Sequence, residues 1–181
     1  MNQSKLRIKD MTMIALFTAI IVICSWITIP TVVPFTLQLF AIFTTLGLLG
    51  GRRGTIAVIL YLLLGIIGIP VFSGMRSGIG VLLSTTGGYL LGFLLSALVY
   101  WLITSLWKSS LPIMAIAMVL GLLLCYLFGT VWFRFLYTQS NGAITTLAVL
   151  QMCVFPFLIP DCIKIILSLI MIKILRKRLP Q

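Results

Sequence analysis

Long apolar runs, separated by short clusters of basic residues, make up most of this sequence. Of its 181 residues, 61% are hydrophobic and only 8% are charged, whereas a typical soluble domain carries about 25% charged residues. A helix needs about 20 apolar residues to cross the roughly 30 Å hydrocarbon core of a membrane. We therefore expect an all-α membrane protein in which residues 1–181 form a single integral membrane domain.

The apolar runs predict six transmembrane helices, and glycine or proline marks most of the breaks between them. A tight basic turn is expected at 50–54, a polar turn at 139–142 and a short helix within 143–154. Because proline suits the first turn of a helix, the last span should start near Pro160. The expected spans are 11–29, 35–50, 55–69, 88–107, 113–137 and 160–175.

The basic residues predict the orientation of these helices. With six spans, both termini lie on the same side of the membrane, and ten of the thirteen Lys and Arg residues fall on that side. Lys and Arg concentrate in cytoplasmic loops, which predicts an N-in, C-in topology. Because the basic clusters alternate with apolar runs, the net charge of +11 does not indicate nucleic-acid binding. The ten residues are Lys5, Arg7, Lys9, Arg52, Arg53, Lys108, Lys173, Arg176, Lys177 and Arg178.

The segment 73–88 interrupts the pattern of apolar spans. It is rich in glycine, serine and threonine but retains Val81, Leu82 and Leu83. Long loops in compact proteins are usually functional or disordered, and these apolar residues argue against disorder. We expect a structured Gly-rich outer loop between the third and fourth helices. Backbone N–H groups at its Gly87-Gly88 end, where a helix starts, can bind an anion or a carbonyl oxygen.

Asp161 and Lys164 are charged residues within an apolar run. A spacing of three places both side chains on one face of a helix, and Asp161 is expected in the first turn, where the helix dipole favours it. Ionisable groups within a membrane are costly and usually mark a functional site. The alternative is a structural ion pair that ties two helices together. Gln38 faces either a cavity or the headgroups, and Arg134 either reaches the interface, which we favour, or binds a carboxylate.

The residue inventory excludes most enzyme chemistry. The chain contains no histidine and two acidic residues, so it lacks the side chains for zinc sites, Ser-His-Asp triads and paired catalytic carboxylates. No P-loop is present to bind ATP. The four cysteines show no metal-ligand spacing. We therefore predict a protein that is not an enzyme and that has no metal or cofactor.

Five segments together resemble the BioY family, the biotin-binding S-components of energy-coupling factor (ECF) transporters, over nearly the whole chain. Their common order on a six-helix plan makes the resemblance specific. Two departures stand out, because Ser84-Thr85 replaces the usual Gly-Pro and Arg76 adds a charge to a loop that is typically neutral. The segments are Val33-Pro-Phe-Thr-Leu-Gln38, Leu49-Gly-Gly-Arg-Arg-Gly54, Tyr61-Leu-Leu-Leu-Gly-Ile-Ile-Gly-Ile-Pro-Val-Phe72, Thr86-Gly-Gly-Tyr-Leu-Leu-Gly-Phe93 and Pro160-Asp-Cys-Ile-Lys164.

This resemblance implies a subunit of a bacterial cell membrane that captures biotin from outside. Import would then use a transmembrane coupling protein and two cytosolic ATPase subunits. The resemblance also matches Ala15 and Ala19 to the alanine motif through which the family contacts the coupling protein. These two residues form a small-xxx-small pair, which lets helices approach closely. Arg76 either assists carboxylate capture or lies in solvent, which we favour. The biotin-binding positions carry over to Thr86, Gly87, Gly88, Tyr89, Asp161, Lys164 and, less directly, Gln38.

Three alternatives to biotin capture remain open from the sequence. The chain could be an S-component for another small vitamin, a structural membrane subunit that binds no solute, or a secondary carrier that works alone. Binding of a panel of labelled vitamins distinguishes biotin capture from an S-component for another vitamin and from a subunit that binds no solute. ATP dependence of uptake distinguishes it from a secondary carrier.

Overall fold

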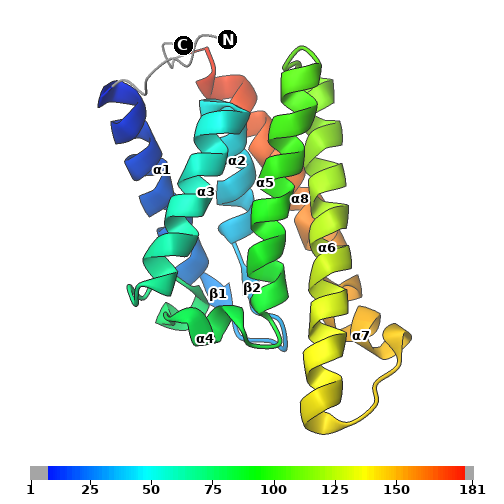
Figure 1. Cartoon of the computed structure of the whole chain (residues 1–181). Coiled ribbons are helices and arrows are strands. Elements are labelled where there is room, and N and C mark those ends of the chain that lie inside the picture. The colour runs from blue at the N-terminus through cyan, green and yellow to red at the C-terminus, as the bar shows by residue number, and fades with distance from the viewer. Residues whose placement is uncertain (1–7, 178–181) are drawn as a thin grey trace.

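Eight α-helices, one 3-10 helix and two short strands are formed by residues 8–177, the part of the chain described by this computed structural model (Figure 1). Lys5, Arg7 and Arg178, which we expected on the basic side, lie outside the described residues. The elements are α1 Ile8–Trp26, β1 Thr28–Ile29, β2 Phe35–Thr36, α2 Gln38–Leu49, α3 Gly51–Ile66, η1 Ser73–Met75, α4 Ile79–Leu82, α5 Gly87–Leu106, α6 Leu111–Asn141, α7 Thr146–Cys153 and α8 Phe155–Leu175.

The six longer helices α1, α2, α3, α5, α6 and α8 run side by side along one axis (Figure 1). α5 packs along α6, whereas α2 contacts α1, α3, α5 and α8 and is therefore the central helix. Most of α2 is buried, and large apolar side chains are exposed along each of the other five long helices. Exposed apolar surface on this scale suits contact with lipid, whereas a water-soluble protein would cover it.

Three of the described helices, α1, α5 and α6, are long and apolar enough by length and composition to cross a membrane. The central helix α2 has 12 residues and is therefore only about 18 Å long. We had expected this helix to begin at residue 35. The residues before Gln38 instead form β2, which pairs antiparallel with β1 through Thr28↔Thr36 and Ile29↔Phe35.

The expectation that the last helix starts near Pro160 is wrong. α8 begins at Phe155, with Pro156 in its first turn and Pro160 inside the helix. An internal proline removes one backbone hydrogen bond, and here the loss falls in the second turn, close to the helix end. Asp161 consequently lies beyond the first turn, so the helix dipole does not account for its position.

Two expected turns are also shorter than predicted. Arg52 and Arg53 belong to the first turn of α3, and the chain reverses at Gly50, whose φ of 81° favours glycine. Likewise, residues 139–141 continue α6, which ends where Gly142 adopts a φ of 89°. In both cases a glycine with positive φ ends the helix, and the polar residues beside it remain helical.

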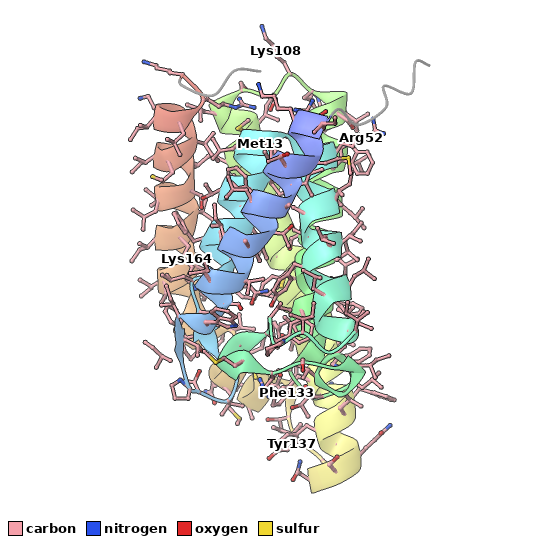
Figure 2. All side chains as sticks on the ribbon, turned by 90° about the vertical axis from the view of Figure 1, so that its left-hand side faces the viewer. Met13, Arg52, Lys108, Phe133, Tyr137 and Lys164 are labelled. Atoms are coloured by element: carbon pink, nitrogen blue, oxygen red, sulfur yellow. The ribbon has the colours of Figure 1, made fainter. Side chains whose placement is uncertain are left out.

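The two ends of the bundle differ in character. The start of α1, the end of α8 and the α2–α3 and α5–α6 turns lie at one end, together with Arg52 and Lys108 (Figures 1 and 2). The strands, α4 and α7 lie toward the opposite end, on the side of Phe133 and Tyr137. Lys164 lies between these two ends (Figure 2). The basic clusters are thus at one end of the described structure, and the irregular segments are at the other.

Candidate functional site

Two adjoining cavities lie where the strands meet α2, α5, α6 and α8. Each has a volume of about 50 Å³, which is enough to hold water molecules. Asp161 and Lys164 line the first cavity, and Gln38, Arg76 and Thr86 line the second. The two cavities share the lining residues Val33, Pro34, Thr36, Tyr89 and Phe93.

The charged pair in the first cavity is buried and hydrogen-bonded. Asp161 and Lys164 are each 5% exposed, and Lys164 Nζ lies 2.8 Å from Asp161 Oδ1. The hydroxyl of Tyr126 in α6 donates to Asp161 Oδ2 at 2.6 Å. Charge-assisted bonds of this kind are stronger than neutral ones, so the carboxylate is held in one orientation.

This arrangement changes the alternative interpretation of the pair as a clamp between helices. Asp161 and Lys164 both belong to α8, so their ion pair lies within one helix. The bond from Tyr126 to Asp161 is the contact that crosses from α6 to α8. A clamp between α6 and α8 therefore depends on the tyrosine hydroxyl and not on the ion pair itself.

The strand β2 places an aromatic ring against the lysine. Lys164 Nζ lies 4.0 Å from the centre of the Phe35 ring, a cation–π contact. Phe35 also stacks on Phe157 of α8, with ring centres 6.0 Å apart. Phe35 thus contacts the ammonium group of Lys164, and its neighbours Pro34 and Thr36 line the first cavity.

Contacts with the central helix fix the position of α8. Ser168 Oγ, one turn beyond Lys164, donates to the carbonyl of Phe40 in α2 at 3.2 Å. Gly47 of α2 leaves room for Ile172, because an added Cβ would lie 2.0 Å from Cδ1 of that side chain. The hydrogen bond at Ser168 and the close packing at Ile172 hold α8 against α2 and so fix where Asp161 and Lys164 lie relative to the first cavity.

The second cavity is lined by neutral polar groups and one cation. Gln38 is 2% exposed, and its Nε2 has no hydrogen-bond partner among residues 8–177. A buried donor without a partner is uncommon and costly. Thr86 Oγ1 lies 3.3 Å from Ser84 Oγ. Arg76 is exposed, and its Nε donates to the carbonyl of Ser73 at 3.1 Å.

Gly87 and Gly88 lie among closely packed atoms and, within the described structure, line neither cavity. An added Cβ would lie 1.8 Å from the carbonyl oxygen of Leu82 at Gly87, and 2.3 Å from Cβ of Trp132 at Gly88. These glycines let the start of α5 approach α4 and α6, and Tyr89 follows them into both cavities. Their lack of a side chain thus permits the packing that brings Tyr89 to both cavities.

Replacing Gly88 with alanine should destabilise the protein. The methyl group would overlap Cβ of Trp132. Because that atom is bonded directly to the backbone, it cannot move aside by a change of rotamer, so α5 and α6 would have to separate. Overpacking of this kind costs about 1–3 kcal/mol, measurable as earlier thermal unfolding in detergent. Gly80→Ala is the control, because a Cβ at Gly80 meets nothing within 4 Å. Equal unfolding temperatures for the two variants would contradict this explanation.

The departure at Ser84-Thr85 is accommodated by contacts within the segment and with α6. Ser84 Oγ donates to the carbonyl of Val81 at 2.7 Å, and Trp132 Nε1 donates to the carbonyl of Ser84 at 3.0 Å. The turn that precedes Thr86 is thus held by hydrogen bonds.

The remaining predicted residues lie away from the two cavities. Arg134 is exposed and donates to Thr146 Oγ1 at 2.9 Å, in a separate groove of about 530 Å³ between α6 and α7. Ala15 and Ala19 are both exposed on α1. Their spacing of four residues places them on the same face of that helix.

Sequence reasoning missed Tyr126 and Phe35. The bond from Tyr126 to Asp161 joins residues 35 positions apart, so no local pattern contains it. A buried tyrosine normally finds a partner for its hydroxyl. The presence of Tyr126 in the apolar run 113–137 was therefore the one available signal that a polar partner lies nearby. The contact between Phe35 and Lys164 depends on the position of β2 relative to α8. The sequence between Pro30 and Pro34 does not predict that position.

Comparisons with known proteins agree over nearly the full length. The family model described as the BioY family matches residues 1–181. Biotin transporter BioY2 of Lactococcus lactis subsp. cremoris (strain MG1363) is 40% identical over 163 residues, which cover 89% of this chain and 86% of that protein. Biotin transporter BioY of Thermotoga maritima is 39% identical over 163 residues, covering 90% and 92%.

One solved structure matches the fold closely. It is the 2.1 Å crystal structure of the S-component for biotin from an ECF-type ABC transporter. The two structures superpose with a TM-score of 0.83 at 30% sequence identity, covering 98% of this chain and 96% of the other.

Proposed function

Because this chain belongs to the BioY family, we propose that it captures biotin outside the cell as the substrate-binding subunit of an ECF-type ABC transporter. The buried Asp161–Lys164 pair beside a cavity is the observation that carries this proposal. A carboxylate and an ammonium group side by side offer an acceptor next to a donor. The ureido ring of biotin presents the complementary pair, an N–H donor next to a carbonyl acceptor.

Each residue then has a defined role in binding. Asp161 accepts a hydrogen bond from a ureido N–H, and its orientation is set by Tyr126. Lys164 carries three N–H donors, one of which faces Asp161, so it can also donate to an oxygen of the ligand. Tyr89 covers the apolar body of biotin, and the segment 73–88 acts as the lid. Movement of Phe35 away from Lys164 opens the path to the charged pair.

The binding site faces outward in the orientation that we propose. Helices α1, α2, α3, α5, α6 and α8 cross the bacterial cell membrane as six spans of one integral domain. The basic end, with Arg52 and Lys108, lies in the cytoplasm, consistent with the bias of Lys and Arg toward that side. The short helix α2 can lie within the membrane because the other helices surround it, which keeps it away from lipid.

Import by an ECF-type ABC transporter uses ATP, which this chain has no P-loop to bind. We assign that role to the two cytosolic ATPase subunits, coupled through the transmembrane coupling protein. Ala15 and Ala19 offer an exposed surface of small side chains on α1 where a helix of the coupling protein can pack closely.

Ala15→Trp should abolish transport while leaving biotin binding intact. The bulky side chain blocks close approach of a partner helix, but it lies on the exposed face of α1 and away from both cavities. Co-purification with the coupling protein and uptake in reconstituted vesicles measure the effect. Ile20→Trp, at an exposed position one residue and about 100° beyond Ala19, is the control. Normal uptake by Ala15→Trp would contradict the assignment.

Binding of labelled biotin to the purified chain tests the proposed function directly. We expect saturable binding that excess biotin displaces and that other small vitamins leave unchanged. Displacement by another vitamin would instead indicate an S-component of different specificity, and the absence of any binding would indicate a structural subunit. Biotin uptake in vesicles without ATP would indicate a carrier that works alone.

A further inference from the structure

The two cavities offer different chemistry to the two ends of a ligand. The first contains the neutralised pair Asp161 and Lys164, whose charges cancel. The second is lined by one cation, Arg76, and its described lining residues include no carboxylate. A negatively charged group therefore meets no net positive charge in the first cavity, whereas Arg76 attracts it in the second.

Biotin has two ends that match this division. Its ureido ring carries both donors and an acceptor, whereas its tail ends in a carboxylate that only accepts hydrogen bonds. On the basis of the proposed function, we infer that Arg76 binds the tail carboxylate of biotin, with the amide of Gln38 as a second, neutral contact. This residue then determines the preference for the acid over uncharged derivatives.

The backbone around Arg76 holds its side chain over the second cavity. Residues 73–76 form a tight turn, in which the N–H of Phe72 donates to the carbonyl of Arg76 at 3.0 Å. Ser73 Oγ donates to Thr28 Oγ1 at 2.9 Å, which ties the turn to β1. Arg76 Nε is used by Ser73, and the guanidinium group carries four further N–H donors in the fork geometry that suits a carboxylate.

Gln38 provides independent support for a ligand in this cavity. Its side chain is almost fully buried and lines the cavity. Within residues 8–177 its Nε2 makes no hydrogen bond of normal geometry, although the Tyr61 hydroxyl is within reach of the amide. A bound oxygen would satisfy that donor, which otherwise represents an uncompensated desolvation cost. Thr86 lines the same cavity and adds a hydroxyl group. The second cavity therefore presents donors from α2 and from two positions of the segment 73–88.

A ligand-by-variant comparison tests this inference. The dissociation constants of biotin and biotinamide, which lacks the negative charge, are measured for the parent chain and for Arg76→Gln in detergent. Because Arg76 is exposed, screening by water limits its effect, and we expect biotin to bind about three- to tenfold more weakly to the variant. Biotinamide should bind equally to both proteins. Arg134→Gln, which removes an exposed cation from the other groove, should change neither constant.

The outcomes separate this inference from the proposed function. Equal weakening of both ligands by Arg76→Gln, or no weakening of either, would overturn the assignment of the carboxylate to Arg76. Weakening of biotin by Arg134→Gln to the same extent would also overturn it, because the effect would then be general electrostatics. Failure of the parent chain to bind either ligand would overturn the proposed function itself.

Discussion

Asp161→Asn is expected to weaken biotin binding by about 100-fold or more. Removing one partner of a buried ion pair leaves the other charge uncompensated, which typically costs about 3–5 kcal/mol. Asparagine also replaces one acceptor oxygen with an N–H₂ donor. That donor would face either Lys164 Nζ or the Tyr126 hydroxyl, both of which now donate to the carboxylate. The variant therefore disrupts the acceptor on which the ureido N–H depends.

Equilibrium binding of labelled biotin to the purified variant measures this effect. Asp10→Asn is the matched control, because Asp10 is the other acidic residue of the chain and pairs with Arg53 at 3.2 Å, at the basic end of the bundle. The control should bind biotin like the parent protein. If Asp161→Asn also bound biotin as tightly as the parent, the assignment of Asp161 to the ligand would be wrong.

Lys164→Met should lower the stability of the ligand-free protein and abolish biotin binding. The double variant Asp161→Leu, Lys164→Met should recover much of the lost stability and still fail to bind biotin. The single change leaves a buried carboxylate with Tyr126 as its partner in α6, at a cost of about 3–5 kcal/mol. Replacing both charges by apolar residues of similar volume is often neutral or stabilising. Here leucine is larger than aspartate and the Tyr126 hydroxyl loses its acceptor, so the recovery of stability should be incomplete. Stability and binding thus separate in the double variant.

Thermal unfolding in detergent and biotin binding are measured together for the parent, the single variant and the double variant. A stable double variant without binding is the outcome expected of a ligand site. A double variant that retains biotin binding would show that the pair does not contact the ligand. Loss of folding in the double variant alone, with a stable single variant, would contradict the cost assigned to the unpaired charge.

Local sequence patterns were sufficient for the family, the helical class and the proximity of the charged pair. The family match confirms the resemblance that the five segments indicated. The spacing of Asp161 and Lys164 is a property of one helix, so their ion pair follows once that helix forms. The position of the helix start did not follow, because Pro156 and Pro160 are both compatible with a first turn and only packing selects between them.

The candidate site was predicted in part. Asp161, Lys164, Tyr89, Thr86 and Gln38 line the two cavities, and their relation to biotin stays a prediction. The binding of a ligand by the N–H groups of Gly87 and Gly88 likewise stays a prediction, and the structure adds that these two residues are packed against Leu82 and Trp132. A Gly-Gly pair has the same appearance in sequence whether a ligand or another helix approaches it.

The sequence by itself determined that this chain forms apolar helices with a buried carboxylate and ammonium three residues apart. Hydropathy and helix periodicity act over a few residues, and both are visible along the chain. Only the tertiary structure decided that Tyr126 holds Asp161, that Phe35 covers Lys164 and that two chemically different cavities adjoin. Those features arise where segments distant in sequence pack together, and the energy of such contacts depends on shape complementarity across the whole bundle.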